Sequence, residues 1–104
     1  MQIITAKQSN NLTVKVAEPF IIELDETPTS GYQWQFEALD DAISLMESKY
    51  LLNQESGIGG GGKRTFRLRI NKTGEFELKV NLIQPWVGLS SAVKKHSFII
   101  HTKN

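Results

Sequence analysis

The first residues to consider for chemistry form one glycine-rich segment, which reads Gly57-Ile58-Gly59-Gly60-Gly61-Gly62-Lys63-Arg64. The segment matches the G-x-G-x-x-G pattern of dinucleotide-binding turns and, except at its last position, the G-x-x-x-x-G-K-[ST] pattern of phosphate-binding loops. Both sites need a strand before the glycines and a helix after them, because amides at the helix N-terminus hold the phosphate. Here a polar stretch precedes the glycines, a strand-like alternation follows them, and Arg64 replaces the hydroxyl that would bind magnesium. The context therefore argues against nucleotide binding. Only a helix after Gly62 would support a nucleotide site.

Other residue types that carry chemistry do not assemble into a predicted catalytic or metal site. The chain has no cysteine, which excludes disulfides, thiolate metal sites and a catalytic thiol. His96 and His101 are five residues apart, so on a strand they point to opposite faces and are not expected to share a metal ion. No nucleophile, base and orienting group fall together in the sequence. We therefore expect a protein that is not an enzyme and that uses no metal or cofactor.

Length and composition indicate a single domain, residues 1–104, whose partners are not selected by charge. The length is close to the commonest domain size, and the net charge is +1 with 22% charged residues. This balance gives no electrostatic reason to bind nucleic acid or an anionic membrane. No apolar stretch approaches the ~20 residues of a membrane-spanning helix, and the N-terminus lacks the pattern of a signal peptide. The expected location is cytoplasmic, or lysosomal or secreted if a leader precedes this chain.

The elements that must position any site are predicted to be short β-strands, because apolar and polar residues alternate along most of the chain. In residues 65–70, Phe66, Leu68 and Ile70 share one face, and residues 75–82 repeat the alternation after a turn at residues 71–74. We interpret these two runs as a β-hairpin with charged side chains of opposite sign across its exposed face, namely Arg67, Arg69, Glu75 and Glu77. Further strands are predicted over residues 12–16, 20–24, 32–36 and 96–101.

Residues 43–52 are compatible with two types of element. Leu45, Met46 and Tyr50 could form a helical stripe, but every neighbouring element is β, so a strand is favoured. Frequent turns between short strands in about 100 residues are typical of a sandwich. The predicted fold is all-β: an immunoglobulin-like antiparallel β-sandwich of seven to eight strands.

Three connections between the predicted strands have unusual composition. With the strands lettered A to G, they are the BC loop (residues 27–31), the DE loop (residues 57–62) and the FG loop (residues 84–88). Such loops emerge at the same end of an immunoglobulin-like sandwich. The glycine run alone fits either a plain strand connection or a main-chain contact surface, and Trp86 fits either a cap on the core or an interface anchor. Their convergence favours a binding surface.

These three motifs resemble those of the chagasin family of cysteine-peptidase inhibitors, whose members inhibit papain-like peptidases. The family signatures are an N-P-T-T-G-[YF] loop, a G-x-G-G loop and an R-P-[WF] loop. They correspond here to Thr27-Pro28-Thr29-Ser30-Gly31-Tyr32, to Gly57-Ile58-Gly59-Gly60 and to Gln84-Pro85-Trp86. The resemblance spans nearly the whole chain. Thr27, Ser30 and Gln84 depart from the usual asparagine, threonine and arginine, so we expect altered affinity or selectivity.

The resemblance implies that the BC loop enters the peptidase cleft and covers the catalytic cysteine, with Thr29 and Ser30 nearest to it. Pro28 and Gly31 make the turn stiff, so that little entropy is lost on docking. The DE loop would lie along one arm of the cleft, and Trp86 would pack on the other side. The expected partner is a papain-like, cathepsin L-type cysteine peptidase, and the free chain is expected to be a monomer. The alternative is a non-inhibitory immunoglobulin-like module that binds another protein.

Overall fold

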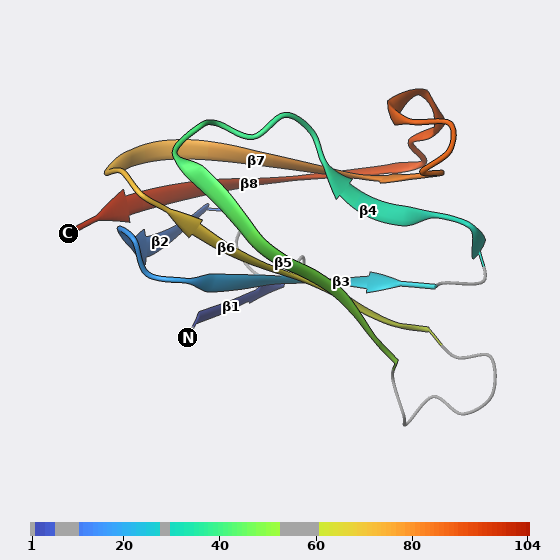
Figure 1. Ribbon diagram of the computed structural model, residues 1–104, viewed down its shortest axis with the longest axis horizontal. Coiled ribbons are helices and arrows are strands. Elements are labelled where there is room, and N and C mark those ends of the chain that lie inside the picture. The colour runs from blue at the N-terminus through green and yellow to red at the C-terminus, as the bar shows by residue number, and fades with distance from the viewer. Residues whose placement is uncertain (1, 6–10, 28–29, 53–60) are drawn as a thin grey trace.

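The chain forms two layers of β-strands (Figure 1). The structure, a computed structural model, describes residues 2–5, 11–27, 30–52 and 61–104. Within these ranges there are eight strands and one short 3₁₀ helix: β1 (Gln2–Thr5), β2 (Asn11–Lys15), β3 (Phe20–Glu26), β4 (Gln33–Phe36), β5 (Ile43–Leu52), β6 (Gly62–Ile70), β7 (Gly74–Ile83), η3 (Leu89–Ser91) and β8 (Lys94–Lys103). The prediction of a strand over residues 43–52 is confirmed.

The strands are divided equally between two sheets, with the orders β1-β3-β6-β5 and β2-β8-β7-β4. The predicted all-β, immunoglobulin-like sandwich is confirmed. Most neighbouring strands are antiparallel, but β1 pairs with β3 and β2 pairs with β8 in parallel. Alternation of apolar residues predicts that a segment is a strand and which face it buries, and it contains no information on strand direction.

The predicted hairpin between residues 65–70 and 75–82 is wrong. β6 pairs with β3 and β5, whereas β7 pairs with β4 and β8, so the turn between β6 and β7 connects the two sheets. The inward face of β7 is apolar, and that of β6 is apolar except for Arg64 near its start. A sandwich buries both faces at once by turning them toward each other across the core. Arg67 and Arg69 therefore lie on the outside of one sheet, and Glu75 and Glu77 lie on the outside of the other.

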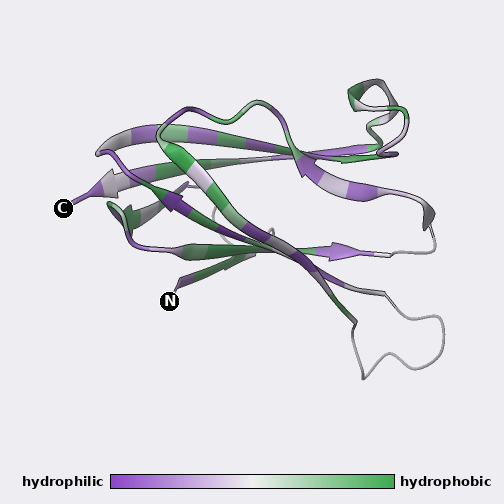
Figure 2. Ribbon diagram, viewed as in Figure 1, coloured by the Kyte–Doolittle hydropathy of each residue, from purple (hydrophilic) through white to green (hydrophobic). Residues whose placement is uncertain are grey.

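The core is built from alternate, buried residues of both sheets. Hydrophobic and hydrophilic residues alternate along several of these strands (Figure 2). The core includes Phe20, Ile22 and Leu24 of β3 and Leu78 and Val80 of β7, and all five are buried. The core continues to the edge of the sandwich, where the rings of Phe36 and Phe66 meet edge to face with centroids 4.6 Å apart. None of the described residues forms a helix long and apolar enough to cross a membrane.

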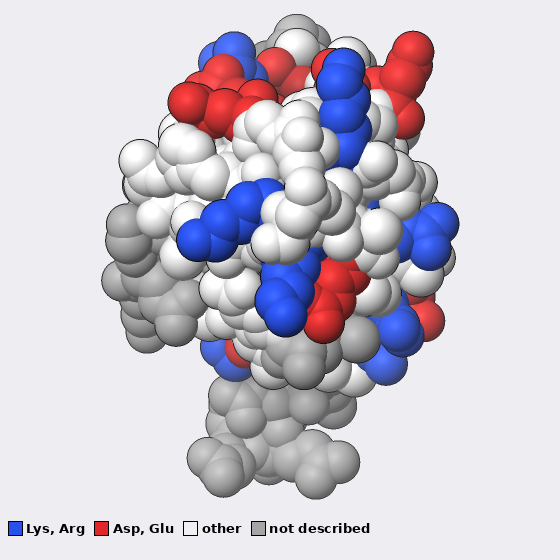
Figure 3. All heavy atoms as spheres, turned by 90° about the vertical axis from the view of Figure 1, so that its left-hand side faces the viewer, with Lys and Arg blue, Asp and Glu red and all other residues white. Residues whose placement is uncertain are grey.

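The two ends of the sandwich differ in character. The end that carries the turn between β6 and β7 has basic and acidic side chains interspersed (Figure 3). The BC, DE and FG loops leave the strands at the opposite end, on the right in Figure 1.

Candidate functional site

The ends of the strands that flank the three loops lie next to one another. Glu26, the last residue of β3, is paired with Gly62, the first residue of β6, and Gly62 is also paired with Leu52 at the end of β5. In the other sheet, Gln33 at the start of β4 is paired with Ile83 at the end of β7. The sandwich therefore brings all three connections to one end.

Part of the predicted contact surface lies outside the described residues, namely Pro28, Thr29, Gly57, Ile58, Gly59 and Gly60. The described residues of the predicted surface are Thr27, Ser30, Gly31, Tyr32, Gly61, Gly62, Gln84, Pro85 and Trp86. Contacts among these residues link each loop to a neighbour.

Two of the described residues of the BC loop, Thr27 and Ser30, are joined by two hydrogen bonds. The Ser30 backbone N–H donates to the Thr27 carbonyl at 3.1 Å, and the Ser30 Oγ donates to the same carbonyl at 2.6 Å. The Tyr32 N–H donates to Ser30 Oγ at 3.2 Å. Gly31 has a φ of +81°, which favours glycine over any residue with a Cβ. The serine that replaces the usual threonine thus keeps a hydroxyl that organises the turn.

Trp34 closes the base of the BC loop. Its backbone N–H donates to Glu26 Oε1 at 2.8 Å, and its indole Nε1–H donates to the Asp25 carbonyl at 2.8 Å. Asp25 and Glu26 precede the loop in one sheet, and Trp34 follows it in the other. These two bonds fix the distance between the ends of the loop, so the turn projects from a rigid base.

The base of the DE loop packs against the BC loop. A Cβ placed on Gly61 would lie 3.3 Å from Thr27 Oγ1 and 3.4 Å from the Glu26 carbonyl oxygen. At Gly62 a Cβ would collide with the Leu51 carbonyl oxygen and the Tyr50 ring. Glycine is therefore required at Gly62 by close packing of the backbone.

The FG loop is held by its own hydrogen bonds. A bridge pairs Gln84 with Gly88, the Gln84 N–H donates to Ser91 Oγ at 2.8 Å, and Ser91 Oγ donates to the Gly88 carbonyl at 2.6 Å. The Val93 N–H donates to the Leu82 carbonyl at 3.0 Å, which ties the end of the connection back to β7.

This bonded FG connection presents apolar side chains to solvent. Trp86 is 72% exposed, and Val87, Leu89 and Val93 are each more than half exposed. A Cβ on Gly31 would lie 3.3 Å from Trp86 Cη2, so the indole edge lies beside the BC turn. Trp86 therefore does not cap the core.

A buried ion pair lies beneath the BC and DE loops, and sequence reasoning missed it. Glu26 lies at the end of a strand, where a carboxylate is usually solvated, but its side chain is only 2% exposed and lies 2.8 Å from the Arg64 guanidinium. The alternation of faces along each strand could have indicated this pair. Residues 20, 22, 24 and 26 share one face of β3, and residues 64, 66, 68 and 70 share one face of β6. Extending the apolar faces by one position places both charges inside the sandwich.

Outside the buried pair, a second charged group borders the DE loop. Lys63 Nζ lies 3.0 Å from Asp25 Oδ1 and 3.6 Å from Glu23 Oε1. The hydrogen bond and the charge of Asp25 raise the pKa of Lys63 above its usual value. Because both Lys63 and Asp25 are well exposed, the pair contributes little to stability.

The two histidines lie on opposite faces of β8, as predicted. His96 shares the inward face of β8 with the buried Phe98 and Ile100, whereas His101 lies on the outer face, 3.9 Å from Glu75. Among the described residues no group of three or more His, Asp or Glu side chains could hold a metal ion.

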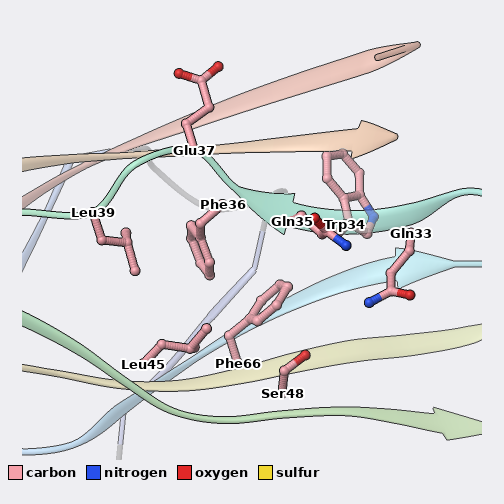
Figure 4. A pocket seen from close by; sticks show the side chains of 9 residues that line it. All are labelled: Gln33, Trp34, Gln35, Phe36, Glu37, Leu39, Leu45, Ser48 and Phe66. Carbon is pink, nitrogen blue, oxygen red and sulfur yellow. The ribbon is translucent and has the colours of Figure 1, made fainter. Parts of the chain in front are cut away.

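A groove of about 350 Å³ lies between β4 and β5, which are edge strands of the two sheets (Figure 4). Phe36, Leu39 and Phe66 point into it, while Glu37 points away. The described loop residues do not line this groove, so the candidate site is the projecting loop end and not a pocket.

Comparisons with known proteins agree with this geometry. The sequence profile described as "Chagasin family peptidase inhibitor I42" matches residues 13–101. Chagasin from Trypanosoma cruzi is 28% identical over 94 residues, which cover 86% of each chain. The cysteine protease inhibitor EhICP2 from Entamoeba histolytica has a similar fold, with a TM-score of 0.81, 20% identity, and coverage of 98% of this chain and 95% of that chain. PbICP-C, solved in complex with falcipain-2, has a TM-score of 0.62 with 14% identity and coverage of 99% and 98%. The profile match spans most of the sequence, and the chain therefore belongs to the chagasin family of peptidase inhibitors.

Proposed function

We propose that this protein is a reversible inhibitor of papain-like cysteine peptidases, and that its BC, DE and FG loops together block the active-site cleft. The observation that carries the proposal is the contact between loops at one end of the sandwich. Gly61 packs on Thr27, and the Trp86 ring lies beside Gly31. A surface assembled from three loops on a rigid frame can enter a cleft at its centre and contact both walls.

The central contact is assigned to the BC loop. Ser30 and its neighbour Thr29 would lie nearest the catalytic cysteine of the peptidase. The loop blocks by occupancy, and the Ser30 bonds and the two Trp34 bonds hold the described residues at both ends of the loop in place. Little conformational entropy is then lost on docking, which favours affinity.

The two outer contacts differ in chemistry. The DE loop, with glycine at most of its positions, suits pairing of main chain with main chain along one arm of the cleft. The FG loop suits apolar packing on the other side, because Trp86 and Leu89 are exposed and held out by internal hydrogen bonds. Exposed tryptophan is the residue type most enriched among interface hot spots.

The departure at Gln84 affects the FG contact. A glutamine lacks the positive charge of the arginine that is usual in the family, so Gln84 cannot form a salt bridge to the peptidase and offers only neutral hydrogen bonds. The Gln84 main chain is fixed by Ser91 and Gly88, so the substitution changes the side-chain contact and leaves the loop frame in place. We expect selectivity among peptidases to depend on this position.

The test is titration of papain and cathepsin L with the purified protein, with residual peptidase activity as the readout. The proposal predicts dose-dependent, reversible inhibition, and intact inhibitor recovered after incubation. Full peptidase activity at micromolar protein would contradict it. Recovery of a different protein partner with no peptidase binding would favour the alternative, a non-inhibitory binding module.

A further inference from the structure

We propose that the buried Glu26–Arg64 pair is a positioning device that holds the BC and DE loops in one relative arrangement and thereby sets the strength of peptidase binding. The proposal rests on the proposed function for its inhibition readout. Its structural part, the ordering of the two loops in the free protein, stands independently of any peptidase.

Both oxygens of the Glu26 carboxylate are used. Arg64 donates to Oε2 from its terminal nitrogen at 2.8 Å and from Nε at 3.1 Å, and the Trp34 backbone N–H donates to Oε1 at 2.8 Å. The two side chains are 2% and 14% exposed. The planar guanidinium and carboxylate therefore fix each other's orientation, because each hydrogen bond has a preferred direction.

The pair touches the chain on both sides of both loops. Glu26 immediately precedes the BC loop, and its partner Trp34 follows it. Arg64 follows the DE loop, and its guanidinium carbon lies 5.9 Å from the centre of the ring of Tyr50, which precedes that loop. One ion pair thus joins the four chain segments from which the two loops project.

Stability alone does not account for charges at this place. The rest of the inward faces of β3 and β6 is apolar, and the two charged side chains interrupt this pattern only at the loop end. Replacing a buried ion pair by apolar residues is often neutral or stabilising, because the desolvation cost of the charges offsets their attraction. What an apolar pair would not supply is a directional link between the two loops, and this is the role that we assign to Glu26 and Arg64.

The test compares the Glu26→Gln/Arg64→Met double variant, which has no buried charge at this place, with the wild type. A matched control is Thr102→Val at the opposite end of the sandwich, where the buried Thr102 hydroxyl donates to the Lys72 carbonyl at 2.6 Å. Three quantities are measured for each chain: the melting temperature, the inhibition constant for papain, and amide hydrogen exchange of residues 30–34 and 61–64 in the free protein.

The double variant is expected to keep a melting temperature near that of the wild type, to exchange faster in both loop segments, and to inhibit papain at least about tenfold less strongly. Thr102→Val is expected to lower the melting temperature and to leave the inhibition constant unchanged.

A folded double variant with wild-type exchange and inhibition would overturn the proposal. Inhibition that simply follows the melting temperature across all variants would overturn it as well. If the double variant does not fold, Arg64→Lys decides the same comparison, because it keeps a positive charge beside Glu26 and removes the planar, directional contact. A wild type that does not inhibit papain would refute the proposed function, while the exchange data would still test the positioning role.

Discussion

Replacing Trp86 by alanine distinguishes two roles of this side chain: binding the peptidase and stabilising the fold. A tryptophan side chain can bury up to about 250 Å². Trp86 is 72% exposed, so roughly 180 Å² remains for a partner and roughly 70 Å² is covered in the free chain. At about 25 cal/mol per Å², these areas correspond to upper limits of about 4–5 kcal/mol for binding and about 2 kcal/mol for folding.

The expected result of Trp86→Ala is therefore asymmetric. Inhibition should weaken by about 30-fold to about 1,000-fold, the effect of losing 2–4 kcal/mol at an interface hot spot. The free energy of unfolding, measured by urea denaturation, should fall by no more than about 2 kcal/mol. The control is Ile3→Ala, which removes a half-exposed apolar side chain on β1, a strand that takes no part in the loop end. A loss of more than about 4 kcal/mol in stability with unchanged inhibition by the folded protein would refute the interface role and restore the core-cap interpretation.

Three further changes have defined outcomes. Gly62→Ala should destabilise the fold by about 1–3 kcal/mol in urea denaturation, because its Cβ would collide with Tyr50 at the end of β5; unchanged stability would mean that this packing relaxes freely. Trp34→Phe removes the indole hydrogen bond to the Asp25 carbonyl, and it should lower the free energy of unfolding by about 1 kcal/mol and weaken inhibition. Inhibition equal to that of the wild type would show that the base of the loop does not need this bond. The pKa of Lys63 is raised in the folded state, so the stability from its pair with Asp25 should be full below the unfolded pKa of 10.5 and decline as pH rises through the folded value. Lys63→Met should therefore flatten the alkaline part of the stability profile and change neutral stability by no more than about 1 kcal/mol, and an unaltered alkaline profile would contradict the assignment.

Much of the fold could be predicted because period-two alternation directly encodes which face of a strand is buried. It identified the strands beside the three loops except β5, which was favoured as a strand because its neighbours are β. The immunoglobulin-like arrangement then placed those loops together. The hairpin between β6 and β7 was predicted wrongly, because an apolar face on each of two consecutive strands is satisfied equally well by pairing in one sheet or by facing across a core. The parallel pairing of β1 with β3 is invisible to alternation for a similar reason.

The part of the candidate site that lies within the three sequence motifs could be predicted. Trp86, Gly31 and Ser30 stand out by residue type, and the structure adds the contacts that join them. The sequence analysis did not predict a contact between Glu26 and Arg64, because a charged residue at a strand end is usually solvated. The alternation of faces along each strand would by itself place the two charges on inward faces, and the pairing register and the burial add that they bind each other.

The most direct test of the central claim is protection of a peptidase's catalytic cysteine. The rate at which iodoacetamide alkylates the active-site thiol of papain would be measured with increasing amounts of the protein, and with Trp86→Ala as the weakened variant. Occupancy of the cleft by the three loops predicts that alkylation slows to a saturating limit near one inhibitor per enzyme, and that the variant needs much more protein to reach it. An alkylation rate that stays unchanged at saturating wild-type protein would contradict the account.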